Sequence, residues 1–227
     1  MPADAPMPPH PTIATFTLGP FATNCYVVSF PGSNSCWIVD ASFGPEPITD
    51  HIRENALTPE LLILTHAHAD HIAGVEDLRE AFSGLPVALH RAEAEFLANP
   101  VLNLSAGFPP SIRCGPAERL LDGNETLTLA SEPFRILHTP GHSPGGITIA
   151  HDPSGTALVG DTLFHDSVGR SDFPTSNPAD LIRSIRTVLY KLPPETTIYP
   201  GHGPRTTIAR EMQRNPFVPA TGPTAFE

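Results

Sequence analysis

The sequence predicts an α/β domain in which mixed β-sheets have helices on their outer faces. Three observations carry this prediction: strand-like runs at the start of the chain, an unbroken apolar run at residues 61–65, and a second series of strand-like runs followed by an amphipathic helix. Strands and helices in this order are typical of sheets covered on the outside. With 227 residues, 40% of them hydrophobic, the chain is long enough for one full core and is not disordered.

The first half of the chain begins with strands and continues with helices. Runs rich in β-branched and aromatic residues predict three strands, at residues 12–17, 24–30 and 36–40. Helical spacing appears at residues 47–55. The run at 61–65 is Leu-Leu-Ile-Leu-Thr, and its lack of polar alternation indicates a strand buried on both faces. Residues 71–82 are predicted to form a helix, with Asp70 placed to cap it.

The second half returns to strands after a long connection. A short strand at 86–89 and a helix at 91–98 precede residues 99–116, a loop long enough to form a lid or a wall of a binding site. Similar runs predict strands at 126–129, 134–138, 146–150, 156–159 and 197–199. Helices are predicted at 178–192, where Leu181 and Ile185 share one apolar face, and at 206–214.

The two ends and the overall composition place limits on function. Residues 1–11 contain five prolines and are predicted to be a flexible extension, residues 12–214 one domain, and residues 215–227 a tail. No apolar run approaches the roughly 18 to 20 residues of a membrane helix, and the N-terminus does not resemble a secretory signal. Three scattered cysteines without a CxxC pair favour a reducing, cytoplasmic location.

The net charge of −11 argues against nucleic acid as the main partner, because a polyanion would be repelled. A small-molecule substrate is therefore expected, and no membrane partner. Part of the excess acidity is explained if some carboxylates bind metal ions. The oligomeric state is left open by the sequence.

The strongest chemical signal lies where the buried strand at 61–65 ends. The segment Thr-His-Ala-His-Ala-Asp-His places four metal-competent side chains within six positions: His66, His68, Asp70 and His71. His66 and His68 are two residues apart, so they can point the same way from an extended segment. Asp70 and His71 are adjacent, so their side chains diverge. One segment can thus serve two metal ions about 3.5 to 4 Å apart.

Three further metal-competent residues each lie beside glycine after a predicted strand. They are His142 in Pro-Gly-His-Ser-Pro-Gly, Asp161 in Gly-Asp-Thr and His202 in Gly-His-Gly. Glycine permits the tight turns that bring a short side chain close to a metal ion. With the first motif they supply seven ligands, a number suited to two metal sites with one shared carboxylate.

This ordered set of motifs resembles the metallo-β-lactamase superfamily, and it is most similar to the short, single-domain glyoxalase II-like (hydroxyacylglutathione hydrolase-like) branch. Residues 24–26, 160–164, 167–172 and 215–217 also resemble that branch. The resemblance implies an αββα sandwich of two mixed β-sheets flanked by helices. It also implies that His66, His68 and His142 bind a first metal ion, that Asp70, His71 and His202 bind a second, and that Asp161 bridges them.

The function implied by the resemblance is hydrolysis of thioesters such as S-lactoylglutathione. Two divalent cations, zinc by default and otherwise iron or manganese, would share a water and lower its pKa from about 15.7 toward neutrality, giving a bridging hydroxide as nucleophile. Asp70 would orient this hydroxide and relay its proton. Arg170 resembles a residue that faces the carboxylate of a glutathione portion. Asp40 resembles an aspartate that supports a metal-binding histidine, although the usual Pro-Gly after it is Ala-Ser here.

Other activities share these motifs. Persulfide dioxygenases use one iron ion and oxygen but share the motifs and largely retain the second-site residues, and lactonases share all seven ligands, so both activities stay open. A true β-lactamase is disfavoured, because those enzymes usually differ at the bridging position held here by Asp161. Only one helix and a tail are expected after His202, which leaves most of a glutathione-binding surface without a counterpart. The loop at 99–116 is then a candidate wall of the substrate pocket.

Overall fold

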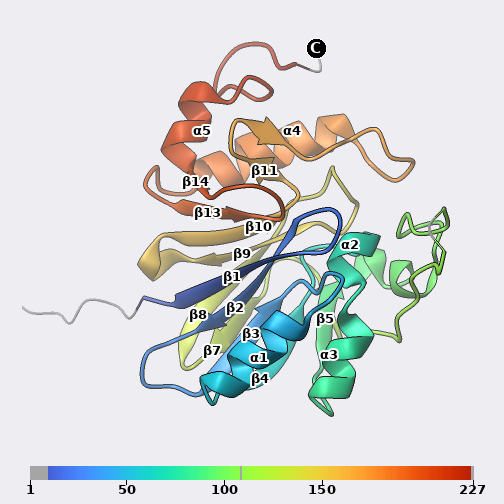
Figure 1. Ribbon diagram of the computed structural model, residues 1–227. Coiled ribbons are helices and arrows are strands. Elements are labelled where there is room, and N and C mark those ends of the chain that lie inside the picture. Colours follow the sequence, from blue (N-terminus) through green and yellow to red (C-terminus); the bar gives the residue numbers. More distant parts are fainter. Residues whose placement is uncertain (1–9, 108, 226–227) are drawn as a thin grey trace, which may run out of the picture.

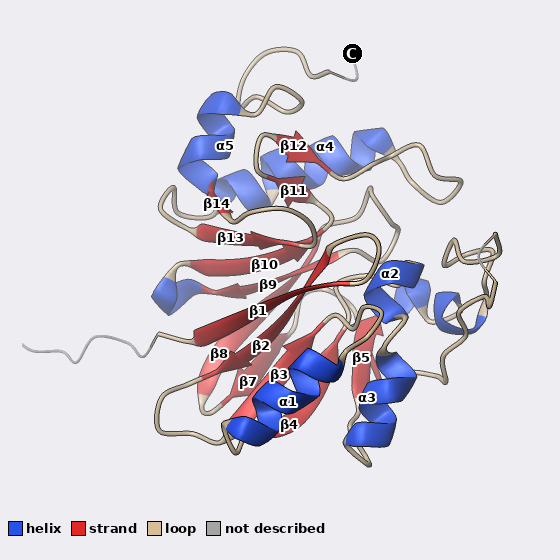
Figure 2. Cartoon of the chain, viewed as in Figure 1, coloured by secondary structure: helices blue, strands red, loops and turns tan. Residues whose placement is uncertain are grey.

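Two six-stranded sheets face each other at the centre of the structure, and helices lie against the outer face of each (Figure 1). The computed structural model describes residues 10–107 and 109–225. The expected extension at residues 1–11 falls almost entirely outside the described residues, as does the end of the expected tail. The layers confirm the predicted αββα sandwich, and Figure 2 shows the strands of the two sheets at the centre with the helices outside them.

The first sheet is mixed, with the order β1-β2-β3-β4-β5-β6. Its strands are β1 (Thr12–Leu18), β2 (Thr23–Ser29), β3 (Ser35–Val39), β4 (Thr58–Ile63), β5 (Val87–His90) and β6 (Arg119–Leu121). β1, β2 and β3 pair antiparallel, whereas β3 to β6 pair parallel. Parallel neighbours need crossover connections, and helices α1 (Glu46–Glu54) and α3 (Val75–Ala81) provide the first two.

The second sheet has the order β14-β13-β10-β9-β8-β7 and is antiparallel except for the pair β10 and β13. Its strands are β7 (Thr126–Leu129), β8 (Glu132–His138), β9 (Ile147–His151), β10 (Thr156–Gly160), β13 (Thr197–Pro200) and β14 (Thr206–Thr207). Helix α4 (Pro178–Thr187) lies in the connection from β10 to β13, and α5 (Ile208–Arg214) follows β14.

Strand alternation divides the apolar residues into three layers. In β2, Val27 packs with the helices on the first sheet, whereas Val28 faces the second sheet. In β4, Leu62 and Ile63 divide in the same way, which confirms that this strand is buried on both faces. The third layer lies between the second sheet and helices α4 and α5. Each sheet therefore contributes to two cores, and its edges are left to carry loops.

The helix expected at 71–82 is split in two, and Asp70 does not cap it. Helix α2 (Ala69–Ile72) begins after His68 and contains Asp70, and no side chain caps it. The break before α3 allows close packing at Gly74, whose N–H donates to the carbonyl of Ala41 at 2.8 Å. A side chain at Gly74 would lie 2.4 Å from the carbonyl oxygen of Ser42. The chain therefore bends here to pack against the loop after β3.

Other differences from the expected elements are local. The helix expected at 91–98 is a pair of 3-10 turns, η1 (Arg91–Glu93) and η2 (Phe96–Ala98). The strands β6, β11 (Leu163–Phe164), β12 (Ser167–Val168) and β14 were not predicted, because runs of two or three residues are too short for a periodic signal. α4 ends at Thr187 and is followed by the 3-10 turn η4 (Leu189–Lys191). Within residues 10–107 and 109–225, no helix is long and apolar enough to cross a membrane.

Phe134 tests the packing between the two sheets. It is fully buried and contacts Trp37, with ring centroids 5.1 Å apart. Phe134→Ala should lower the free energy of unfolding by about 3–5 kcal/mol, because it removes a large buried side chain and leaves a cavity. Denaturant titration measures this change. Val101→Ala, at a side chain that is 69% exposed, should stay within about 0.5 kcal/mol of the wild type; equal effects of the two substitutions would contradict the layer assignment.

Candidate metal centre

The seven predicted ligand residues lie at one edge of the sandwich, in loops and, for Asp70 and His71, in the short helix α2. Strand β9 runs opposite to both β8 and β10, and β13 is parallel to β10, so β8, β10 and β13 all end at the same edge. His142, Asp161 and His202 follow these three ends. The loop after β4, in the facing sheet, brings the remaining four residues to the same place. Side chains from four segments distant in sequence are therefore brought together by the strand directions.

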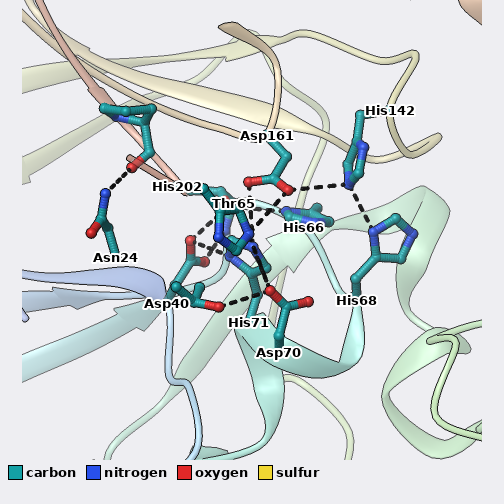
Figure 3. Close-up of polar contacts among 12 residues, drawn as sticks. Asn24, Asp40, Thr65, His66, His68, Asp70, His71, His142, Asp161 and His202 are labelled. Atoms are coloured by element: carbon teal, nitrogen blue, oxygen red, sulfur yellow. Dashed lines mark hydrogen bonds and ion pairs between the residues drawn. The ribbon is translucent and has the colours of Figure 1, made fainter. Parts of the chain in front are cut away.

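The structure gathers all seven side chains into three overlapping groups whose potential ligand atoms lie within 4.8 Å of one another. The groups are His66, His68 and His142; His66, His71 and Asp161; and Asp70, His71 and His202. Figure 3 shows these side chains pointing toward a common centre. The first and third groups are the two triads implied by the resemblance. The middle group connects them.

Asp161 lies between the two triads. Its Oδ2 atom is 3.5 Å from His142 Nε2 and 3.4 Å from His202 Nε2, while its Oδ1 atom is 3.4 Å from His71 Nε2. On the far side, Asp70 Oδ2 lies 3.2 Å from His202 Nε2. The carboxylate of Asp161 thus contacts histidines of both triads, as a shared ligand must.

The buried polar atoms of this cluster fit a divalent cation. His66 Nε2, His71 Nε2 and Asp161 Oδ1 are buried and have no hydrogen-bond partner among the described residues. A buried polar atom without a partner lowers the stability of the folded state by roughly 1–3 kcal/mol. Several such atoms at one point therefore indicate a site for a group that binds them. Imidazole and carboxylate ligands suit zinc, iron and manganese, and the cluster contains no thiolate that would select among them.

Hydrogen bonds behind the rings turn the Nε2 atoms inward. His142 Nδ1 donates to the carbonyl of Arg170 at 2.7 Å, and His202 Nδ1 donates to the carbonyl of Phe21 at 3.1 Å. A carbonyl can only accept, so both rings present Nε2 to the cluster with its lone pair free when the ring is neutral. His68 differs, because its Nδ1 faces the cluster, 2.9 Å from His142 Nε2.

Asp40 occupies the supporting position that the resemblance suggested. Its Oδ2 atom lies 2.9 Å from His71 Nδ1 and accepts the Thr65 hydroxyl at 2.8 Å, and its Oδ1 atom accepts the Thr65 N–H at 2.7 Å. The residue has a positive φ of 62°, a conformation that costs energy for a side chain other than glycine. The carboxylate of Asp40 therefore joins the end of β3 to the start of the first metal-competent segment.

The two triads differ in charge. Burial, and after it the neighbouring His142, lower the pKa of His68 to about 3, so this ring is neutral near pH 7. Burial also works against a charge on His202, but its hydrogen bonds to Asp161 and Asp70 outweigh burial and raise its pKa to about 10. His71 behaves like His202: burial is opposed by Asp70, Asp40 and Asp161, and its pKa is raised.

Glu93 is a supporting residue that sequence reasoning missed. Its buried carboxylate accepts hydrogen bonds from the Ala67 N–H at 2.5 Å, from the Gly145 N–H at 2.7 Å and from the Ser143 hydroxyl. Ala67 lies between His66 and His68, and Ser143 follows His142. Glu93 therefore fastens together the two loops that carry the first triad. Burial raises its pKa, although the three hydrogen bonds oppose this.

No local sequence signal distinguishes Glu93 from Glu95, because both lie in the same polar stretch. Only the structure shows that Glu93 is buried and Glu95 is exposed. A second support comes from the segment at residues 24–26, which belongs to the motifs that carry the resemblance. Asn24 Nδ2 donates to the carbonyls of Pro200 and Gly203 at 3.0 and 2.8 Å. The Tyr26 hydroxyl donates to Pro200 at 2.5 Å. These bonds hold the loop that carries His202.

A cavity of about 540 Å³ opens beside the cluster. It is lined by Phe21, His68, Ala69, Asp70, Leu104, His142, Asp161, Phe164, Ser167, Val168, Arg170, Phe173 and His202. Arg170, the residue that the resemblance relates to substrate binding, lines this cavity. Its guanidinium is also paired with Asp172, at 2.9 and 2.8 Å, and lies 4.4 Å from the ring centroid of Phe173.

The fold and the cluster together define an αββα sandwich with a candidate metal centre at one edge. The family described as "Metallo-beta-lactamase superfamily" matches residues 18–202. The chain therefore belongs to the metallo-β-lactamase superfamily, which supports a metal-dependent hydrolase and a small-molecule substrate. It is 35% identical over 202 residues to "Probable metallo-hydrolase YqgX" of Bacillus subtilis, covering 88% of this chain and 94% of that protein.

Other relatives carry more specific names. The chain is 34% identical over 200 residues to "Hydroxyacylglutathione hydrolase GloC" of Haemophilus influenzae, covering 87% of this chain and 93% of that protein. The crystal structure of BLEG-1 B3 metallo-beta-lactamase is similar, with 37% identity, a TM-score of 0.87 and coverage of 93% and 100% of the two chains. The crystal structure of TTHA1623 in a di-iron-bound form has 35% identity, a TM-score of 0.79 and coverage of 90% and 100%.

Glu93→Gln tests the support of the first triad. Glutamine keeps the size of the side chain, but its amide nitrogen cannot accept the Ala67 N–H. We expect zinc affinity, measured by competition with a chelator, to fall about 10- to 100-fold, the usual effect of losing a residue that orients metal ligands. Glu95→Gln, an exposed neighbour in the same segment, should bind zinc like the wild type. Equal affinities of both variants would show that Glu93 does not position the triad.

The raised pKa values of His71 and His202 predict proton release on metal uptake. At pH 8 the metal-free protein holds a proton on His202, whose pKa is about 10, and coordination requires the neutral ring. Metal binding at pH 8 should therefore release at least one proton, and apparent affinity should fall as the pH is lowered. Calorimetry in two buffers of different ionisation enthalpy measures the release. His165→Ala, outside the cluster, should leave it unchanged; uptake without proton release would contradict the assignment.

Proposed function

We propose that this protein is a binuclear metal-dependent hydrolase of thioesters such as S-lactoylglutathione. In this proposal His66, His68 and His142 hold one divalent ion, Asp70, His71 and His202 hold the other, and Asp161 is shared. The observation that supports it best is the convergence of these seven side chains beside a cavity of about 540 Å³. Zinc is the default metal, and the likeness to a di-iron-bound structure supports testing iron equally.

Bound divalent ions supply a Lewis acid and lower the pKa of water from 15.7 to about 7. The residues of this chain supply position and proton transfer. Asp70 lines the cavity, and the Thr23 hydroxyl donates to its Oδ2 atom at 2.8 Å, which fixes the carboxylate. In this position Asp70 can orient an attacking water and accept its proton. Burial of the cluster keeps these interactions in a low-dielectric environment, where they are stronger.

The cysteines do not offer an alternative nucleophile. Burial raises the pKa of Cys25, Cys36 and Cys114 to about 12 each, so all three are thiols at neutral pH. A thiol is a poor nucleophile compared with its thiolate. Water activated at the cluster is therefore the nucleophile that the site supports, which agrees with hydrolysis.

The choice of thioesters rests on the sequence motifs and on the relative named hydroxyacylglutathione hydrolase. A β-lactam substrate is the second candidate, supported by the 37% identity to the structure titled a B3 metallo-β-lactamase. Lactone hydrolysis and persulfide oxygenation are activities of related enzymes that share these motifs, and both are included as further arms of the test.

One assay series distinguishes these activities. The metal content of the purified protein is measured, and the protein is then loaded separately with zinc and with iron. Each form is assayed with S-lactoylglutathione, a β-lactam, an acyl-lactone, and glutathione persulfide with oxygen uptake. We expect thioester hydrolysis to have the highest kcat/KM. Persulfide-dependent oxygen uptake by the iron form, without thioester cleavage, would replace the proposal by its dioxygenase alternative.

His68→Ala tests the ligand assignment directly. It removes one ligand of the first triad, so it should lower the metal content and reduce kcat/KM by on the order of 100-fold or more. Cys114→Ala is the control, because Cys114 is buried outside the cluster and should affect neither metal nor activity much. Thermal unfolding of both variants shows whether they are folded. A folded His68→Ala protein with full metal content and full activity would refute the assignment.

A further inference from the structure

The walls of the cavity differ sharply from its floor. The floor consists of cluster residues, whereas the walls are mostly apolar side chains from four separate segments. They are Phe21 in the β1–β2 turn, Leu104 in the loop at 99–116, Phe164 and Val168 in the hairpin of β11 and β12, and Phe173 after it. Pockets that bind small molecules by shape are largely apolar with a few fixed polar groups, and a volume of about 540 Å³ is within their usual range.

The position of Leu104 is built into the fold. Its backbone has a positive φ of 67°, which is unfavourable for a branched side chain. The neighbouring Asn103 holds this conformation: its carbonyl accepts the Ala69 N–H at 2.8 Å, and its side chain donates to the carbonyls of Phe96 and Ile112 at 2.9 and 3.1 Å. The loop is thereby attached to the start of α2, which carries Asp70, and Leu104 is held at the cavity wall.

Charged groups contribute little to these walls. Outside the cluster, Arg170 is the one charged residue among the described residues that line the cavity. It is 66% exposed and already paired with Asp172. An exposed ion pair changes affinity by less than about five-fold, whereas each methylene group buried against an apolar wall contributes about four-fold. Glutathione carries two carboxylates, so at most one of them can find a cation here.

We propose that this site selects its substrates by an apolar group next to the scissile carbonyl, an acyl or aryl chain of several carbon atoms, and not by the charges of the thiol. This inference rests on the proposed function, because it assumes that a carbonyl is placed at the cluster. It assigns Leu104, Phe164 and Phe173 as residues that determine specificity. The half-buried side chains of these residues would lose their remaining contact with water when the chain binds.

Two series of thioesters test the inference on the metal-loaded protein. One carries acetyl, butanoyl and hexanoyl groups on glutathione, and the other carries the same groups on the neutral thiol N-acetylcysteamine. In both series kcat/KM should rise about two- to four-fold per methylene group, mainly through a lower KM. Cleavage that is independent of chain length, or restricted to the glutathione series, would overturn the inference and leave the proposed function standing.

Binding of the free acids distinguishes the proposed thioester hydrolysis from the proposed selection of an apolar chain. Acetate, butanoate and hexanoate are added to the metal-loaded protein, and affinity is measured by calorimetry. Hexanoate should bind more tightly than acetate by the same two- to four-fold per methylene group. If no thioester is cleaved but hexanoate binds more tightly, the proposed function fails and the apolar selectivity stands. If all three acids bind equally, the inference fails.

Leu104→Gly tests whether the Leu104 side chain in the cavity wall causes the preference for longer acyl chains. Glycine adopts a positive φ without strain, so this variant should remain folded, with a Tm within a few degrees of the wild type. Loss of the side chain should reduce the chain-length dependence of kcat/KM to about half or less. Val101→Ala, on the same loop but outside the cavity lining, should retain the wild-type dependence. An unchanged dependence in Leu104→Gly, or an equal loss in Val101→Ala, would contradict the role of Leu104.

Discussion

The buried carboxylate of Asp161 is the group on which the candidate centre depends. It contacts His71, His142 and His202, and its Oδ1 atom has no hydrogen-bond partner among the described residues. A buried charge is tolerated only when it is paired or coordinated, so the surrounding imidazoles are required by this one side chain. The fit is close, since a side chain at Gly201 would lie 2.1 Å from Asp161 Oδ1. Glycine before His202 therefore allows the two ligand loops to meet.

Two other buried carboxylates keep the loops in place. Asp40 connects the ends of neighbouring strands to His71, and Glu93 connects the loops on either side of the first triad. Each accepts three hydrogen bonds from groups distant in sequence, and two of the three on Glu93 come from backbone N–H groups. These two bonds attach the backbone of each loop directly to the buried Glu93 carboxylate. The metal-competent atoms are thus arranged before any ion binds, which reduces the entropy that binding has to overcome.

The loops at the same edge of the sandwich line the cavity that leads to the candidate metal centre. The segments that line the cavity are the β1–β2 turn, the loop at 99–116 and the hairpin of β11 and β12, none of which belongs to the two large sheets. The segments that follow the strand ends therefore carry the metal-competent residues, while other loops line the cavity. This division is common where one fold serves many substrates, because loops change without disturbing the scaffold. Apolar walls beside a charged floor place the reacting group where water can be excluded.

The sequence alone determined the fold class, most of the strands and all seven residues of the cluster. These features depend on local composition: β-branched runs, the burial of residues 61–65 on both faces, and metal-competent side chains beside glycine. It did not determine the split between α2 and α3, the 3-10 turns that replace the helix at 91–98, or the role of Glu93. Each of these depends on contacts between segments far apart in the chain, such as Glu93 with Ser143 and Gly74 with Ala41. Tertiary packing decided them because the energy of such contacts exceeds the small local preferences that a sequence pattern reports.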